Sequence, residues 1–281
     1  MSDLFYEHHT NIRKDMLCPF ILSLREHSLD CICNWHENVE ILMVTEGDGT
    51  LRYGNVEMQV CAGDMIIVNS RTIHRLYSEI GVSYYFIIID EGFCTENGLS
   101  VKERSFTPIV RSEESRRLFS ELVRAVEDYR SGGNSFQLKA AKARLSVIAL
   151  LIELCEHHSK IEEHRDEKEK PSEEYIKNII AYMADHYRES LTLESLSAIC
   201  GITKYYLARE FKRYTGQTVF TYLNSIRCKN ADICLSEGKS VTEAAYECGF
   251  ESISYFSRTY KKSTAYRRPN FQKNSFYFEL M

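Results

Sequence analysis

The later part of this chain contains a sequence repeat. The segment "LTLESLSAICGITKYYLAREFKRYTG" (residues 191–216) is followed, at an offset of 49 positions, by "SVTEAAYECGFESISYFSRTYKKSTA" (residues 240–265). At this offset Tyr206 aligns with Tyr255, and Arg209 aligns with Arg258. Similarity at a fixed offset indicates copies of one structural unit, and two copies are too few for a stacked solenoid. The sequence therefore predicts two related small modules.

The first copy has the pattern of a helix-turn-helix. Its first helix is expected to bury the apolar face that carries Leu193, Leu196 and Ile199. Gly201 then supplies a turn, because glycine tolerates positive φ, and Thr203 is a suitable N-cap for the second helix. That second helix is predicted to turn its apolar residues inward, namely Tyr206, Leu207 and Phe211.

The second copy repeats this plan. Gly249 supplies the turn and Ser252 the cap. Its apolar positions are predicted to face inward: Ala244, Ala245, Cys248, Tyr255, Phe256 and Tyr260. Residues 218–237 between the copies indicate one long helix, with Phe220, Leu223, Ile226, Ile233 and Leu235 as candidate core positions.

Basic residues at equivalent positions of the two copies indicate DNA binding. A helix held by a partner helix and a sharp turn can enter the major groove of DNA. Arg209 and Arg258 can each form two hydrogen bonds with a guanine edge. The neighbouring lysines and arginines fit phosphate contacts, which position the protein. The alternative is a solvated basic face on a small helical bundle.

At these residues the chain resembles the AraC-type family of bacterial transcription regulators. The matching segments are "YYLAREFKRYTGQT", "FTYLNSIR" and "VTEAAYECGFESISYFSRTYKK". The resemblance implies an all-α domain with two helix-turn-helix units joined by a long helix, and a dimer that reads two half-sites of double-stranded DNA. The chain departs from the family pattern at Val219, Ala265 and Pro269, which puts the last turn before Phe271 in doubt.

Groove-facing positions carried over by this resemblance fall on Tyr205, Ala208 and Arg209 in the first unit, and on Ser254, Ser257 and Arg258 in the second. With the cap and phosphate candidates added, the complete predicted DNA-binding set is Thr203, Lys204, Tyr205, Ala208, Arg209, Lys212, Arg213, Ser252, Ser254, Ser257, Arg258, Lys261 and Lys262.

Charge is distributed unevenly along the chain. Residues 192–273 hold 13 Lys and Arg against 7 Asp and Glu, a net charge of +6. The whole chain carries −5, so the remainder carries −11. A basic segment on an acidic chain favours one nucleic-acid-binding face. Neither a signal peptide nor an apolar run of membrane length is recognisable, so we expect a cytoplasmic protein in which the ten scattered cysteines are reduced.

The earlier half is typical of a β-domain. Seven or so short runs rich in β-formers are separated by Gly, Asn and Asp, which predicts a sandwich or a barrel. Two amphipathic helices are predicted between residues 112 and 158. They are expected to pack on the barrel and to form a dimer through a stripe of Leu145, Ile148, Leu151, Ile152 and Cys155.

The predicted fold class is therefore α+β with several domains. A β-barrel is expected at residues 1–110, a helical hairpin for dimerisation at 111–158, a charged linker at 159–171 and the DNA-binding domain at 172–281. Length alone supports two domains, each able to bury a core.

A second pattern lies in the β-region. His36, Glu40, Gly47, Gly63, Asp64 and His74 resemble the two motifs of the cupin barrel, in which such positions supply metal ligands. Asn34, Asn69 and Arg71 depart from that pattern. The three side chains His36, Glu40 and His74 could hold a divalent metal, line a metabolite-sized pocket, or be satisfied polar groups.

The regulators that this chain resembles generally bind small effectors without a metal. The resemblance therefore implies an effector pocket, for which the candidates are Arg25, His36, Glu40 and His74, with no metal and no cofactor. Trp35 is expected on the face opposite His36, and only one of Tyr84 and Tyr85 can line the barrel, because successive side chains of a strand point to opposite faces.

The predicted function is a non-enzymatic, sequence-specific transcription regulator controlled by a small molecule, with a sugar or related metabolite as the favoured class. By resemblance, an activator that contacts RNA polymerase is favoured over a repressor, and a homodimer is expected. Two alternatives stay open: a cupin metalloenzyme with an appended DNA-binding domain, and a regulator whose barrel binds no effector.

Overall fold

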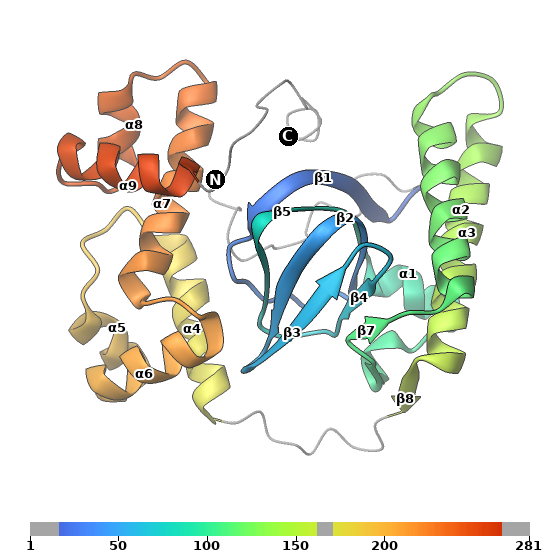
Figure 1. Ribbon diagram of the computed structural model, residues 1–281, viewed down its shortest axis with the longest axis horizontal. Helices are drawn as coiled ribbons and strands as arrows, with labels where there is room; N and C mark the ends of the chain where they lie inside the picture. The colour runs from blue at the N-terminus through green and yellow to red at the C-terminus, as the bar shows by residue number, and fades with distance from the viewer. Residues whose placement is uncertain (1–16, 162–170, 266–281) are drawn as a thin grey trace.

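The computed structural model describes residues 17–161 and 171–265, with side chains through residue 262. A curved β-sheet lies between two helical groups, α2 with α3 on one side and α4 to α9 on the other (Figure 1). Residues 1–16 of the predicted barrel domain, most of the predicted charged linker and the positions Pro269 and Phe271 lie outside the described residues. No helix in the described part is long and apolar enough to cross a membrane.

The curved sheet is antiparallel, with strand order β1-β5-β2-β4-β7 and with β3 paired to β2. Its strands are β1 (Phe20–Asp30), β2 (Glu40–Tyr53), β3 (Val56–Cys61), β4 (Met65–Val68), β5 (His74–Ile89) and β7 (Ile109–Val110). The prediction of a β-domain followed by an all-α domain is confirmed.

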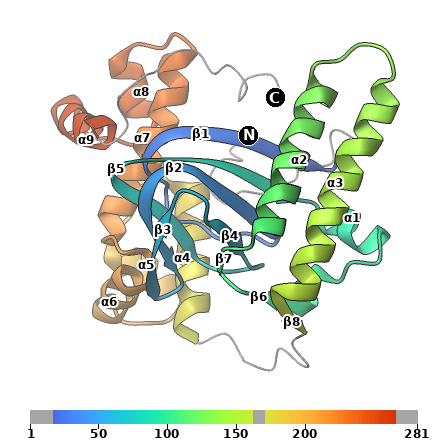
Figure 2. The same cartoon turned by 45° about the vertical axis from the view of Figure 1, so that its right-hand side comes forward.

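Two pairs of predicted short strands are each one long strand. The sequence predicts short runs separated by Gly, Asn and Asp, but β2 continues through Gly47 and β5 through Gly81, with shifts of register between Val44 and Glu46 and again after Gly47. A side chain at Gly47, which has φ of 77°, would collide with the carbonyl oxygen of Gly81 on the neighbouring strand. The glycines therefore permit close bulges, and the bulges bend the sheet over itself instead of ending it (Figure 2).

Alternation along these strands builds two apolar layers. Leu42, Ile66 and Phe86 belong to the cluster inside the curve of the sheet. Their neighbours Ile41 and Met65 belong to the cluster that packs against the helices. A continuous apolar run in the sequence is thus a strand that is buried on both faces.

The helices on the outer layer are α1 (Glu91–Glu96), α2 (Glu113–Arg130) and α3 (Phe136–His157). α2 and α3 occupy the two segments predicted as amphipathic helices. The short elements η2 (Val101–Glu103), β6 (Arg104–Phe106) and β8 (Ser159–Ile161) were not predicted, and β8 pairs with β6 where a linker was expected to begin.

The predicted dimerisation stripe on α3 is partly wrong. Leu151 and Cys155 are buried against the sheet and α2, because they lie on the same face as Val147 and Leu154. Leu145 and Ile152 are exposed. Leu138, one heptad before Leu145, is exposed as well and extends this outward stripe.

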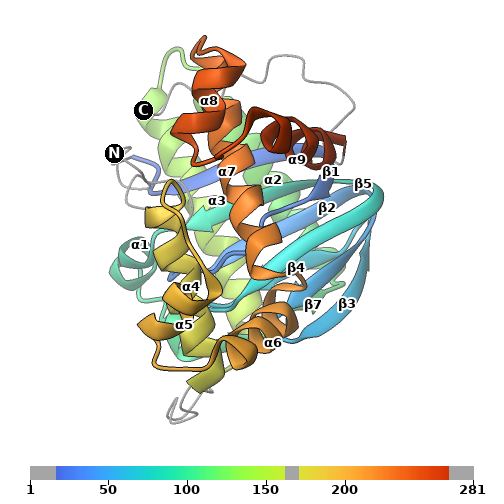
Figure 3. The same cartoon turned by 90° about the vertical axis from the view of Figure 1, so that its left-hand side faces the viewer.

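The remaining helices form the C-terminal domain, for which the sequence predicts DNA binding. They are α4 (Pro171–His186), α5 (Leu193–Ile199), α6 (Lys204–Thr215), α7 (Val219–Ser236), α8 (Val241–Glu247) and α9 (Ile253–Ala265). Figure 3 shows α7 linking the pair α5–α6 to the pair α8–α9. The two repeated segments are therefore two helix-turn-helix units, as the sequence predicted.

The starts of these helices follow from their caps. Thr192 and Ser240 each form a capping box at the equivalent helices α5 and α8. Thr203 accepts a hydrogen bond from the Tyr206 amide, as predicted for an N-cap. Gly249 has φ of 80°, and a Cβ there would approach the carbonyl oxygen of Arg188 to 2.7 Å.

Three inward predictions in this domain are wrong. Ile199, Phe220 and Tyr255 have 45%, 43% and 45% of their surface exposed. The hydroxyl of Tyr255 accepts a hydrogen bond from the Asn224 side chain on α7, so its ring lies across the domain surface. The apolar periodicity of these helices therefore includes more positions than the core of this domain contains.

Candidate functional site

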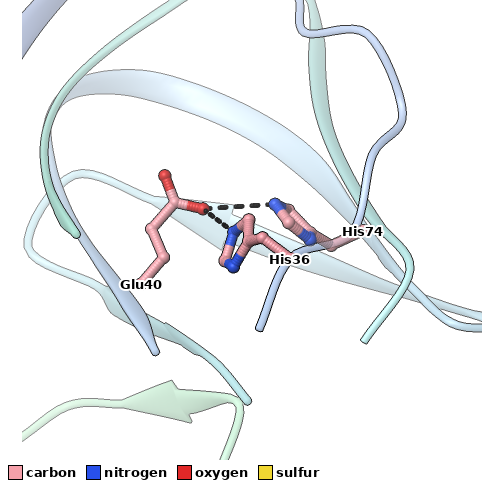
Figure 4. Close-up of side chains that lie close together, drawn as sticks. All are labelled: His36, Glu40 and His74. Atoms are coloured by element: carbon pink, nitrogen blue, oxygen red, sulfur yellow. Dashed lines mark hydrogen bonds and ion pairs between the residues drawn. The ribbon is translucent and has the colours of Figure 1, made fainter. Parts of the chain in front are cut away.

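Three buried polar side chains meet where the segment before β2 bridges to the start of β5. His36 precedes β2, Glu40 is the first residue of β2 and His74 is the first residue of β5 (Figure 4). Their exposed fractions are only 1%, 8% and 7%. The structure thus brings together three of the four residues predicted from the sequence to bind an effector.

One carboxylate oxygen joins the cluster. Glu40 Oε2 lies 3.1 Å from His36 Nε2 and 3.2 Å from His74 Nε2. Potential ligand atoms of all three residues lie within 4.8 Å of one another. Burial alone would raise the pKa of Glu40, but hydrogen-bond and electrostatic interactions with His36 and His74 lower it well below its ordinary value. The carboxyl group is therefore an anion in the folded protein.

The second nitrogen of each ring is held by the backbone. His36 Nδ1 donates to the carbonyl oxygen of Asn38 at 2.7 Å, and His74 Nδ1 donates to that of Thr72 at 3.0 Å. The backbones are joined too, since Asn34 and His74 form a two-bond bridge and the Arg71 amide donates to the His36 carbonyl. The orientation of both rings is consequently fixed from two sides.

The fourth candidate, Arg25, lies further along the same interior. It is opposite Tyr84 in the β1–β5 ladder, and its guanidinium lies 5.5 Å from the ring centre of Phe86. Of the tyrosine pair left open by the sequence, Tyr84 faces the interior and contacts the Cys31 sulfur at 2.6 Å, whereas Tyr85 packs toward α2. Cys31 is an interior polar group that the sequence did not single out for the site.

The residues next to the two histidines pack into the DNA-binding domain. Cys33, Trp35 and Ile73 are buried in the same apolar cluster as Ile176 of α4 and Tyr222 of α7. Trp35 therefore lies opposite His36, as expected, and on this opposite face it meets another domain. Sequence reasoning missed this contact.

Polar groups reinforce the contact between the domains. The Tyr222 hydroxyl donates a buried 2.5 Å hydrogen bond to the Cys33 carbonyl oxygen. On α4, the Lys177 ammonium lies 5.6 Å from the Trp35 ring centre and is paired with Glu173 at 3.3 Å. The Arg71 guanidinium bonds Glu174 of the same helix at 3.4 Å. No local pattern in the sequence marks the partners across this contact, because they are more than 100 residues apart.

A further contact reaches the first recognition helix. Arg52, on β2, donates a 2.9 Å hydrogen bond to the carbonyl oxygen of Arg213 near the end of α6. This carbonyl is at a helix C-terminus, where the backbone dipole favours a cation. The sheet thus touches the unit that carries Arg209.

The predicted DNA-contacting residues lie on the surface of both units. Tyr205 is 79% exposed, and Ser254, Ser257 and Arg258 are exposed on α9. Ala208 and Lys204 are partly buried, and Lys204 pairs with Glu194 at 2.5 Å. The other members of the set are exposed: Thr203, Arg209, Lys212, Arg213, Ser252, Lys261 and Lys262.

Glu210 organises two of these cations. It is buried on α6 and pairs with Arg209 at 3.0 Å and with Arg213 at 2.9 Å. The side chain of Arg209 is nevertheless 70% exposed. The carboxylate can therefore orient both guanidinium groups while leaving their outer edges available to DNA.

Comparison with known proteins gives consistent matches in both halves. Residues 21–154 match the model of an AraC-like ligand binding domain, and residues 196–268 match that of a helix-turn-helix domain. An uncharacterised HTH-type transcriptional regulator of Pseudoalteromonas carrageenovora is 30% identical over 115 residues, covering 41% of this chain and 69% of that protein.

Longer but weaker matches extend over both domains. The HTH-type transcriptional activator RhaS of Pectobacterium atrosepticum is 22% identical over 248 residues, covering 82% of this chain and 83% of RhaS. Among solved structures, ToxT of Vibrio cholerae aligns with 93% of this chain and 98% of its own, at 14% identity and a TM-score of 0.45.

Proposed function

Since the chain belongs to the AraC-type family of transcriptional regulators, with an AraC-like ligand-binding domain and a DNA-binding helix-turn-helix domain, we propose that it activates transcription in response to a small molecule. Its effector would bind inside the curved sheet, where His36, Glu40 and His74 meet. Carbohydrates are the first class to test. The protein would act on double-stranded DNA in the cytoplasm, by binding and not by catalysis.

One observation carries this proposal. In each of two backbone segments, neighbouring residues point to opposite sides. His36 and His74 face the interior of the sheet, while Trp35 and Ile73 lie in the core of the DNA-binding domain. A ligand that moves either histidine must therefore displace a residue on which α4 and α7 pack. Such a ligand shifts the balance between docked and released arrangements if its affinity differs between them.

We propose a division of labour along the predicted boundaries. We propose effector binding by residues 1–110, dimerisation by residues 111–158, a connection at 159–171 and DNA binding by residues 172–281. Within the last of these, Arg209 and Arg258 are the proposed base-reading residues, and the surrounding lysines and arginines are the proposed phosphate contacts. Contact with RNA polymerase would follow from binding beside a promoter.

The proposed dimer interface is the exposed stripe on α3. Leu138, Leu145 and Ile152 are spaced by seven residues and are 57%, 65% and 41% exposed. Residues seven apart share one helix face, so these side chains can pair with the same stripe of a second copy. Leu145→Glu should yield monomers in sedimentation, whereas Val56→Glu, at a 54% exposed position on β3, should not.

The central experiment is a DNA-binding assay with the full-length protein. DNA from upstream of its own gene is bound in competition with random DNA, at two salt concentrations, with and without candidate sugars and other metabolites. Preference for the upstream DNA that changes with one added compound supports the proposal. Equal, salt-sensitive binding to both DNAs at every condition contradicts sequence-specific regulation.

A further inference from the structure

The equivalent arginines of the two recognition helices are held differently. On α6, the Glu210 carboxylate uses both of its oxygens: Oε1 accepts a hydrogen bond from Arg209 Nε at 3.0 Å, and Oε2 lies 2.9 Å from Arg213 Nη2. The Arg209 guanidinium also lies 5.2 Å from the ring centre of Tyr206. A charge-assisted hydrogen bond and a cation–π contact together fix the direction of this guanidinium.

The second unit has no carboxylate at the equivalent position. At the offset of 49 residues, Glu210 aligns with Thr259, whose side chain carries no charge. Arg258, the residue that aligns with Arg209, is exposed, and no carboxylate in the part of the chain that the structure describes pairs with it. The side chain of Arg258 therefore keeps rotamer freedom that Arg209 has lost.

The aromatic support of the arginines differs as well. Tyr255 aligns with Tyr206, but its hydroxyl accepts a 2.7 Å hydrogen bond from Asn224, so its ring is engaged by α7. Within the described residues, the cation–π contact that Arg209 makes has no counterpart at Arg258. Although the two units are copies of one plan, they present one oriented arginine and one unrestrained arginine.

Orientation before binding changes how an arginine discriminates between bases. An arginine that becomes ordered only on DNA loses rotamer entropy at that moment, which lowers its affinity by about 2–12-fold. An arginine that is already oriented avoids this loss when it meets guanine. Opposite another base it cannot turn to a phosphate, so its donors are desolvated without acceptors. Orientation therefore raises the affinity for guanine and lowers the affinity for the other bases.

The part of Arg209 that Glu210 leaves available suits guanine. The carboxylate engages Nε, whereas the two Nη groups form the fork that bonds the O6 and N7 atoms of guanine. Glu210 itself is only 4% exposed, so it orients the arginine without competing for the base. Its negative charge weakens the attraction to every phosphate alike. Loss of Glu210 should therefore reduce base preference and not general affinity.

We infer that Glu210 is a positioning residue that determines specificity, and that the first unit distinguishes guanine from other bases more strictly than the second. The inference rests on the proposed function, in which Arg209 and Arg258 read bases. A DNA site suited to this protein contains a strictly required guanine at the position contacted by α6 and a tolerant position contacted by α9.

The test measures base preference with the full-length protein. The protein first selects its preferred DNA from a randomised library, and duplexes with single base changes then compete with that DNA. Arg209→Ala and Arg258→Ala identify the two contacted positions, because each variant loses the preference at its own position. In the wild type, the preference for guanine should be stronger at the Arg209 position. Glu210→Thr should reduce it there by about 2–12-fold and bind random DNA at least as tightly as the wild type.

Two further variants test the reciprocal change and control for charge. Thr259→Glu places a carboxylate in the second unit and should sharpen the preference at the Arg258 position by a similar factor. Glu194→Gln removes a negative charge from an exposed position on α5, where Glu194 pairs with Lys204 at 2.5 Å. This control should strengthen binding to all DNAs alike and leave the base preferences unchanged.

The outcomes separate the inference from the proposed function. If the wild type selects no preferred DNA, sequence-specific regulation is contradicted, and the inference with it. Equal preference at the two arginine positions, or wild-type preference in Glu210→Thr, overturns the inference alone. An equal loss on preferred and random DNA also overturns it, because that result shows a structural role. If circular dichroism shows that Glu210→Thr is unfolded, an unchanged preference in Thr259→Glu overturns the inference instead.

Discussion

Tyr222→Phe removes one hydrogen bond between the sheet and the DNA-binding domain. The Tyr222 hydroxyl donates to the Cys33 carbonyl oxygen at 2.5 Å, and both residues are fully buried. Burial raises the pKa of Tyr222 well above its ordinary value, so the hydroxyl stays a donor at every physiological pH. Phenylalanine keeps the edge-to-face packing of the ring on Phe211, whose centre is 5.3 Å away.

The free-energy cost of Tyr222→Phe comes from the buried Cys33 carbonyl oxygen, which loses its hydrogen-bond donor. A buried carbonyl oxygen deprived of its donor loses about 1–3 kcal/mol, more than the roughly 1 kcal/mol net value of an average hydrogen bond. At 1.4 kcal/mol per factor of ten, the docked arrangement becomes about 5–150 times less favoured relative to the released one. A chain of this size should also lose about 2–4 °C of melting temperature per kcal/mol.

Fluorescence of Trp35 measures the effect directly, because this residue is buried in the same cluster as Tyr222. Emission of Tyr222→Phe should shift to longer wavelength and be quenched more strongly by acrylamide. The matched control is Tyr246→Phe, which changes a 55% exposed ring on α8. If both variants keep the emission and melting temperature of the wild type, the two domains do not depend on this bond and the reasoning about their docking is refuted.

Three further predictions concern other parts of the molecule. Arg209→Ala and Arg258→Ala should each weaken binding to specific DNA by about 1–3 kcal/mol in a competition assay; an equal loss on random DNA would show phosphate contacts instead. The hydrogen bond from Arg111 lowers the pKa of Asp64 below its ordinary 3.8, so this carboxylate stabilises the fold above pH 3.8 and the stabilisation is lost as the pH falls through the lowered value. Asp64→Asn should therefore flatten the decline of the urea midpoint as the pH falls below 3.8, and an unchanged decline would exclude Asp64 as its source. Ser240→Ala should cost about 1 kcal/mol of stability through loss of the α8 capping box, whereas Ser240→Asp should retain it; equal melting temperatures of the two variants would contradict that role.

Local patterns in the sequence predicted those features of the structure that depend on residues close together in the chain. The offset of 49 residues, with a turn glycine and a cap in each copy, was sufficient to predict two helix-turn-helix units. The resemblance to the cupin motifs also grouped His36, Glu40 and His74, and the structure brings them together where the bridge between Asn34 and His74 joins the segment before β2 to the start of β5. Each of these signals is contained within a few dozen residues.

Features that depend on distant partners could not be predicted in this way. Tyr222 and Cys33 are 189 residues apart, and nothing near either marks the bond between them. Which of Tyr84 and Tyr85 faces the interior of the sheet could not be decided without the register of β5. Glycines at positions 47 and 81 indicated chain reversals, yet a glycine also permits a bulge, and only the neighbouring strand distinguishes the two.

The alternation of Trp35 with His36 and of Ile73 with His74 has a consequence for how such a regulator can evolve. A mutation that adapts the ligand site to a new compound changes a backbone segment that also contacts the DNA-binding domain. Specificity and signalling are therefore inherited together, and few substitutions can alter one without disturbing the other. Lineages that change their ligand would be expected to acquire compensating substitutions on α4 and α7, the helices that Trp35 and Ile73 touch.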